Sequence, residues 1–151
     1  MLTMGLIDDM QNAALQQPTS NGGNHPLWIL GHLAYSESNI IEHMIKGNEN
    51  PLIDWKPVFG AGSQPTTNVD DYPPWSEVRA KADEVRTNTL AFVDSLSDQD
   101  LDNPSQNPPP GREDFFGTIG ACLLVLTLHS TMHHGQVADA RRMIGREPLL
   151  A

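Results

Sequence analysis

The chain has 151 residues, of which 38% are hydrophobic, and this length suits one domain built around a single core. Its 9 Lys and Arg stand against 19 Asp and Glu, giving a formal net charge of −10, a sign that repels nucleic acid and anionic membranes as partners. The N-terminus has neither a basic start nor an apolar core typical of a signal peptide, and no apolar stretch reaches the ~20 residues that span a bilayer. We therefore expect one domain over residues 1–151, located in the cytoplasm.

The first half of the chain contains two segments with helical spacing of apolar residues. The first runs from about Leu2 to Gln16. The second runs from about Pro26 to Lys46, with Asn24 or His25 as its N-terminal cap and Gly47 as its stop.

Two more helices are predicted in the second half. One runs from about Trp75 to Leu96 and carries an apolar stripe at three- and four-residue spacing. The other runs from about Thr118 to Ile144, with Thr118 as its cap and Gly145 at its end. Its core-facing seam alternates steps of four and three residues, and its members are Cys122, Leu126, His129, His133, Gln136, Ala140 and Met143.

The loops between these helices are rich in Pro and Gly. The longer one, Asn48 to Pro74, can reach from one end of a 20-residue helix to the other. A loop of this length usually serves a function or acts as a crossover. The pattern predicts an all-α fold, a four-helix bundle with a long crossover loop between the second and third helices.

Two histidines, His129 and His133, lie four residues apart on the core seam of the last helix, so they share one face. Buried imidazoles cost free energy unless their polar atoms are satisfied. Either a metal bound by both rings or hydrogen bonds to other core side chains would satisfy them. Because Ser130 follows His129, the segment lacks the Glu of the zinc-protease motif, so the sequence does not favour that activity.

A third ligand is expected from the second helix, where His32 lies on a partly apolar face suited to the interior. His43 is 11 residues further on, about 16 Å along the axis, and cannot share the site. His134 points roughly 100° away from its neighbour, and His25 is better placed as a cap.

Two segments together resemble the DinB superfamily. The first is Asn24-His25-Pro26-Leu27-Trp28-Ile29-Leu30-Gly31-His32-Leu33, and the second is His129-x-x-x-His133-x-Gly135-Gln136-Val137 followed by Arg141, Arg142 and Gly145. The Phe59-Gly60-x-Gly62-Ser63-x-Pro65 loop and Tyr72-Pro73 are similar to a subgroup of the same family.

The resemblance implies a four-helix bundle with a metal triad at His32, His129 and His133. It also implies one divalent metal, zinc or nickel, a small-molecule substrate and a homodimer. Characterised relatives include transferases and isomerases that use a low-molecular-weight thiol as cosubstrate. Many relatives carry an acidic residue where this chain has Ser130.

The leading hypothesis is a metal-dependent transferase or hydrolase acting on a small electrophilic substrate. The alternatives are a non-catalytic metal-binding protein of the stress response and a structural helical dimer with hydrogen-bonded core histidines. No catalytic residue is assigned. The side chains expected to support the metal or line its pocket are Tyr35, Ser36, Asn39 and Gln136. Those expected either to anchor the crossover loop or to form an apolar lid are Trp55, Phe59 and Tyr72.

Overall fold

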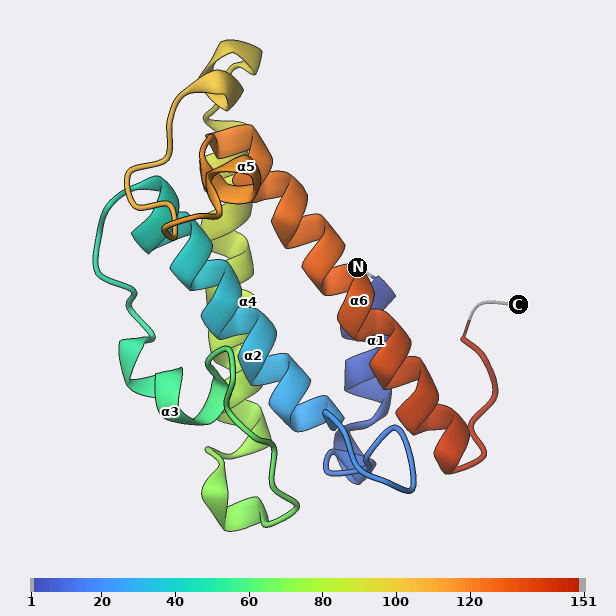
Figure 1. Cartoon of the computed structure of the whole chain (residues 1–151). Coiled ribbons are helices and arrows are strands. Elements are labelled where there is room, and N and C mark those ends of the chain that lie inside the picture. The colour runs from blue at the N-terminus through green and yellow to red at the C-terminus, as the bar shows by residue number, and fades with distance from the viewer. Residues whose placement is uncertain (1, 150–151) are drawn as a thin grey trace.

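The computed structural model describes residues 2–149, which form helices and no β-strand (Figure 1). The α-helices are α1 (Leu2–Asp9), α2 (Pro26–Ser38), α3 (Lys56–Phe59), α4 (Trp75–Asp94), α5 (Glu113–Phe116) and α6 (Ile119–Met143). The π-helical segment η2 (Asn39–Ile45) continues α2, and the 3-10 turns are η1 (Gln11–Ala13), η3 (Ile53–Trp55), η4 (Val69–Asp71) and η5 (Asp98–Asp102). Among the described residues, no helix combines the length and hydropathy needed to cross a bilayer.

The predicted second, third and fourth helices agree with the structure to within two residues at each end when α2 and η2 are taken together. The predicted caps are also confirmed. The His25 side chain accepts a hydrogen bond from the Trp28 amide, and the Thr118 side chain accepts one from the Ala121 amide. Gly47 ends the second helix with a φ of +77°, which glycine adopts without steric cost.

The first helix is shorter than predicted, because α1 ends at Asp9 and only a 3-10 turn follows. The carbonyl of Asp9 accepts a hydrogen bond from Arg146, far along the chain, in place of the next helical amide. The prediction of a helix to Gln16 was therefore wrong, and the local apolar spacing gave no sign of this long-range contact.

The core is centred on α2, whose residues 26–32 are all buried. This helix packs most extensively on α4 and also contacts α6, while α1 packs on α6. Figure 1 shows the three long helices α2, α4 and α6 side by side, with α1 behind the C-terminal half of α6.

The segment between α2 and α4 is tied to α2 by side chains of α2 and its cap. The indole nitrogen of Trp28 donates to the Val58 carbonyl at 3.0 Å, and a ring nitrogen of His25 donates to the Thr66 carbonyl at 2.8 Å. Gly31 permits the close approach of Phe59, since a Cβ at that position would lie 2.3 Å from the phenyl ring. The segment was predicted as an irregular loop, but it contains η3, α3 and η4.

Candidate metal centre

The structure brings together three histidines that the sequence analysis selected. His32 comes from α2, and His129 and His133 come from successive turns of α6. The Nε2 atom of His129 lies 3.0 Å from that of His32 and 3.1 Å from that of His133. One ligand atom from each residue lies within 4.8 Å of the others, so the three rings converge on a common point.

Two of these rings are held in one tautomer by acceptors on their outer side. Nδ1 of His32 lies 2.6 Å from the Phe59 carbonyl, and Nδ1 of His133 lies 2.9 Å from Oε1 of Gln136. Both oxygens can only accept, so each Nδ1 carries the proton and each Nε2 presents a lone pair. The same Gln136 oxygen also accepts from the Asn24 amide at 3.1 Å, which fixes its orientation.

With both Nδ1 protons used in this way, the cluster has too few N–H donors for its Nε2 lone pairs. His129 Nε2 lies within hydrogen-bonding distance of two lone pairs and, when the ring is neutral, can donate to only one of them. At least one lone pair in a largely buried setting then has no donor, which costs free energy. Hydrogen bonding among the three rings therefore does not satisfy them, whereas a shared cation would.

Burial also disfavours the protonated, charged form of each of the three histidines, and so lowers their pKa values. Burial, with a smaller contribution from the neighbouring His133, lowers the pKa of His32 to about 4. Burial likewise lowers the pKa of His129 to about 4, with smaller contributions from His133 and His32. The pKa of His133 is lowered for the same reason. At neutral pH all three rings are neutral, which is the form that binds metals.

The donor set fits a first-row divalent metal. In a tetrahedral site with metal–nitrogen distances near 2.0–2.1 Å, neighbouring ligand atoms lie about 3.3 Å apart. The observed 3.0 and 3.1 Å require the rings to separate by only a few tenths of an ångström. Three protein ligands leave at least one coordination position for another molecule.

Trp28 supports His32 in a way that the sequence analysis missed. The two rings stack with centroids 4.4 Å apart and an interplanar angle of 12°. The four-residue spacing places Trp28 on the same side of α2 as His32, but the sequence analysis assigned it no contact with that ring. The Phe59 carbonyl was also missed, because no sequence pattern reveals a backbone partner 27 residues away.

The four side chains predicted to support the metal or line its pocket do not share one site in the structure. Tyr35 and Asn39 line an open cleft of about 940 Å³, which is also bounded by Lys56, by Ala61 and by residues 106–110. Ser36 is half-buried and does not line this cleft. Gln136 contacts His133 directly, as described above. Ser130 points toward α1, where its hydroxyl lies 3.4 Å from that of Thr3.

The remaining histidines lie outside the cluster. His25 is fully buried and caps α2, and burial lowers its pKa. His43 is exposed and contacts the Asn48 carbonyl at 3.2 Å. His134 lies 3.5 Å from the Thr3 hydroxyl.

Of the predicted loop anchors, Phe59 is fully buried, and the Tyr72 hydroxyl accepts a hydrogen bond from the Thr66 amide and donates one to the Thr66 carbonyl.

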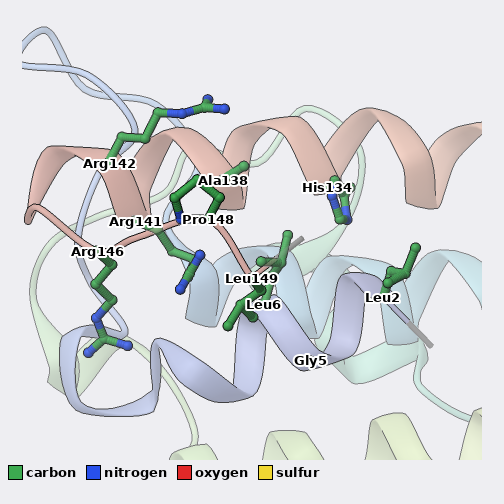
Figure 2. A pocket seen from close by; sticks show the side chains of 10 residues that line it. All are labelled: Leu2, Gly5, Leu6, His134, Ala138, Arg141, Arg142, Arg146, Pro148 and Leu149. Carbon is green, nitrogen blue, oxygen red and sulfur yellow. The ribbon is translucent and has the colours of Figure 1, made fainter. Parts of the chain in front are cut away.

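A second pocket, of about 480 Å³, lies between α1 and the C-terminal end of α6 (Figure 2). Its three arginines already have acidic partners: Arg141 and Arg146 bind Asp9, and Arg142 binds Asp139. These arginines are therefore already paired within the protein, and the histidine cluster remains the better candidate site.

Comparison with known proteins places the chain in a family. The model of the DinB superfamily matches residues 1–137, which cover most of the chain and include all three histidines of the cluster. A search of curated proteins found no significant match. The chain belongs to the DinB superfamily.

Proposed function

We propose that this member of the DinB superfamily is a divalent-metal-dependent enzyme whose metal is held by His32, His129 and His133. Zinc and nickel are the metals best suited to three neutral imidazoles. The reaction is a thiol-dependent transfer or a hydrolysis on a small electrophilic substrate. The architecture that carries the site is a four-helix bundle in which α1 supplies the short fourth helix.

One observation carries the proposal: three Nε2 atoms lie close together, and their lone pairs outnumber the N–H groups that could donate hydrogen bonds to them. A buried cluster of unpaired lone pairs is costly in a purely structural core, and a cation removes that cost. The observation therefore favours a metal site over histidines that serve only as core residues.

The protein's own residues perform the positioning. The Phe59 carbonyl holds the His32 ring and Gln136 holds the His133 ring, so that both Nε2 atoms face the centre of the cluster. Trp28 stacks on His32. Such outer contacts also raise the basicity of the ligand nitrogen. A bound divalent ion would supply the Lewis acidity that lowers the pKa of a coordinated thiol or water.

The cleft lined by Tyr35 and Asn39 is the proposed place for the substrate. Tyr35 lies three residues after His32, nearly one helical turn further along α2, so one wall of this cleft belongs to the helix that carries a candidate ligand. Its lining includes several amide side chains that can donate and accept hydrogen bonds, among them Asn39, Asn48 and Asn107. This lining favours a polar small molecule.

The proposal is tested with protein loaded with cobalt(II), whose absorption spectrum reports on its ligands. A model thiol such as glutathione is added, followed by an arylating electrophile, and a panel of activated esters is tested separately. We expect either a thiolate-to-metal absorption band with consumption of the electrophile or ester hydrolysis. Either activity should be absent from the His129→Ala variant. Stoichiometric metal with neither activity would contradict the enzyme and favour the non-catalytic metal-binding protein.

A further inference from the structure

The pocket between α1 and the C-terminal end of α6 combines apolar and cationic side chains (Figure 2). Leu2 and Leu6 of α1 line it together with Leu149, which follows α6. Three of the chain's six arginines also line it, and none of its lining residues is acidic, although the chain carries a net charge of −10. Its volume of about 480 Å³ falls within the range of small-molecule sites. The lining of the pocket therefore has the opposite charge to the whole protein.

Arg141 is the most buried of the three arginines, and only 5% of its surface is exposed. Figure 2 shows its side chain extending from α6 toward α1, whereas Arg142 points to the opposite side of α6. Its Nε donates to Asp9 at 2.9 Å, but its Nη1 and Nη2 make no hydrogen bond within residues 2–149. Unpaired N–H groups of a buried guanidinium cost free energy. These two nitrogens therefore call for an acceptor, and the pocket that Arg141 lines can admit one.

The charges around the pocket do not balance. Arg141 and Arg146 both bind Asp9, and Arg142 pairs with Asp139. Hydrogen bonds from Arg141 and Arg146 lower the pKa of Asp9, so its carboxylate is ionised and carries a single negative charge. Three guanidinium groups and two carboxylates leave one positive charge over. One bound monoanion would neutralise it.

We propose that this pocket binds a small monocarboxylate with an unbranched apolar tail, of the kind found in medium-chain fatty acids. The carboxylate is held by the two Nη atoms of Arg141, because the planar guanidinium fork matches the two oxygens of a carboxylate. The tail lies against the leucines of the pocket and is removed from water. A neutral amphiphile would leave the positive charge unbalanced, and a phosphate dianion would exceed it.

This site is separate from the histidine cluster. None of the three histidines of the cluster lines the pocket. His134 does line it, but its side chain lies about 100° around α6 from that of His133. Binding in the pocket requires no metal, so the inference goes beyond the proposed enzyme and does not depend on it.

Isothermal titration calorimetry with three ligands tests the chemistry of the site. Octanoate is compared with decanoate, which adds two methylene groups, and with 1-octanol, which has the same chain length and no charge. Decanoate should bind roughly tenfold more tightly than octanoate, because the added groups are buried. 1-Octanol should bind about tenfold more weakly than octanoate, because it forms no charge-assisted pair with Arg141. Absence of carboxylate binding, or equal affinity for octanoate and either of the other ligands, would overturn the proposal.

Gly5→Leu tests the location of the bound ligand. Gly5 lines the pocket, and a Cβ built on it meets nothing within 4 Å, so a leucine side chain occupies part of the pocket while all three arginines remain. Leucine favours a helix more than glycine does, so the variant should fold. Decanoate affinity should fall about tenfold or more, because the ligand and the new side chain compete for one volume.

The matched control is Gly135→Leu, at a glycine of α6 that also faces open space and lies outside the pocket. It should bind decanoate like the unmodified protein. Unchanged binding in Gly5→Leu, or an equal loss in the two variants, would contradict the assignment to this pocket.

Arg141→Gln tests the contact with the carboxylate. Loss of the guanidinium should weaken octanoate binding about tenfold and leave 1-octanol binding unchanged, which also shows that the pocket is intact. Arg112→Gln removes an equal charge from an exposed arginine outside the pocket and should change neither. His129→Ala should also bind both ligands normally, whether or not the protein is an enzyme. Full octanoate affinity in Arg141→Gln, or loss of octanoate binding in His129→Ala, would overturn the proposal.

Discussion

At the scale of single residues, the site depends on acceptors that hold imidazole rings rather than on the rings alone. His32 and His133 each use Nδ1 to bind an oxygen, and this choice exposes the Nε2 lone pairs to the centre of the cluster. Gln136 has a further role, because its oxygen also binds Asn24 and so joins α6 to the segment before α2. Removing such an outer contact typically weakens metal binding without removing a ligand.

Gln136→Leu tests this role. The substitution removes the acceptor of His133 and frees the ring to rotate, so zinc affinity should fall about 10- to 100-fold. Competition with a chromophoric chelator measures the affinity. Gln99→Leu, at an exposed glutamine of η5, is the control and should bind zinc normally. Equal affinity in both variants would show that Gln136 does not orient the ring.

Gly31→Ala tests the contact between α2 and Phe59. The new methyl group would meet the phenyl ring at 2.3 Å, so the ring and the Phe59 carbonyl that binds His32 must move. We expect a loss of about 1–3 kcal/mol of unfolding free energy, measured by urea denaturation. Gly5→Ala in α1 meets nothing within 4 Å and should be neutral or stabilising. Equal effects of the two substitutions would contradict this account.

The three candidate ligands could be predicted from the sequence because helical periodicity places histidines on faces. Tyr35, Ser36 and Asn39 were predicted as one group on the same basis, yet only two of them line the cleft. The neighbouring loops determine where a cleft opens, and their path depends on backbone contacts such as the one from Trp28 to Val58. Periodicity carries no information about those contacts.

At the scale of elements, the long helices could be predicted from the sequence, whereas the structure of the segments that connect them could not. Side-chain caps mark the starts of α2 and α6, and Gly47 and Gly145 follow the ends of η2 and α6. The start of α4 directly follows two prolines, Pro73 and Pro74. The end of α1 is set by Arg146, which is distant in sequence. The change from α- to π-helix at Asn39 was also not foreseen, and residues 35, 39 and 43 line the cleft from both sides of this change.

The contact between α2 and α4 includes an ion pair between the buried Glu37 and the partly exposed Arg86. Oε2 of Glu37 lies 2.7 Å from Arg86, while Oε1 has no hydrogen-bond partner within the described residues. Burial raises the pKa of Glu37, and the charge of Arg86 opposes that rise. The carboxylate therefore depends on its partner.

Arg86→Met should leave the Glu37 charge uncompensated and lower the unfolding free energy by about 3 kcal/mol, the low end for a buried pair because Arg86 is partly exposed. Adding Glu37→Leu to the same variant removes the buried charge and should recover most of the loss. Urea denaturation of the two variants measures both effects. A double variant as unstable as the single one would contradict this account of the pair.

At the scale of the whole molecule, the low pKa values of the histidine cluster make the metal-free fold sensitive to acid. The unfolded chain protonates His32 and His129 near the ordinary value of 6.5, whereas in the fold their pKa values are about 4. The unfolded state therefore binds more protons between these limits. Stability should be constant above about pH 6.5 and fall as the pH drops toward 4, by up to about 1.4 kcal/mol per pH unit for each group.

Urea denaturation of chelator-treated protein between pH 4 and 7 measures this dependence. A His129→Gln variant lacks one of the histidines whose pKa is lowered in the fold, so its stability should fall less steeply. The same slope in both proteins would mean that His129 does not titrate as the structure implies.

The most direct test of the central claim is the metal content of untagged protein, measured by inductively coupled plasma mass spectrometry after purification. The account predicts about one zinc or nickel per chain, lost from His129→Ala and His133→Ala and retained by His43→Ala, whose imidazole is exposed and outside the cluster. Absence of metal from the purified protein, together with failure of the metal-free protein to take up added zinc or nickel, would contradict the account. The three histidines would then be structural core residues.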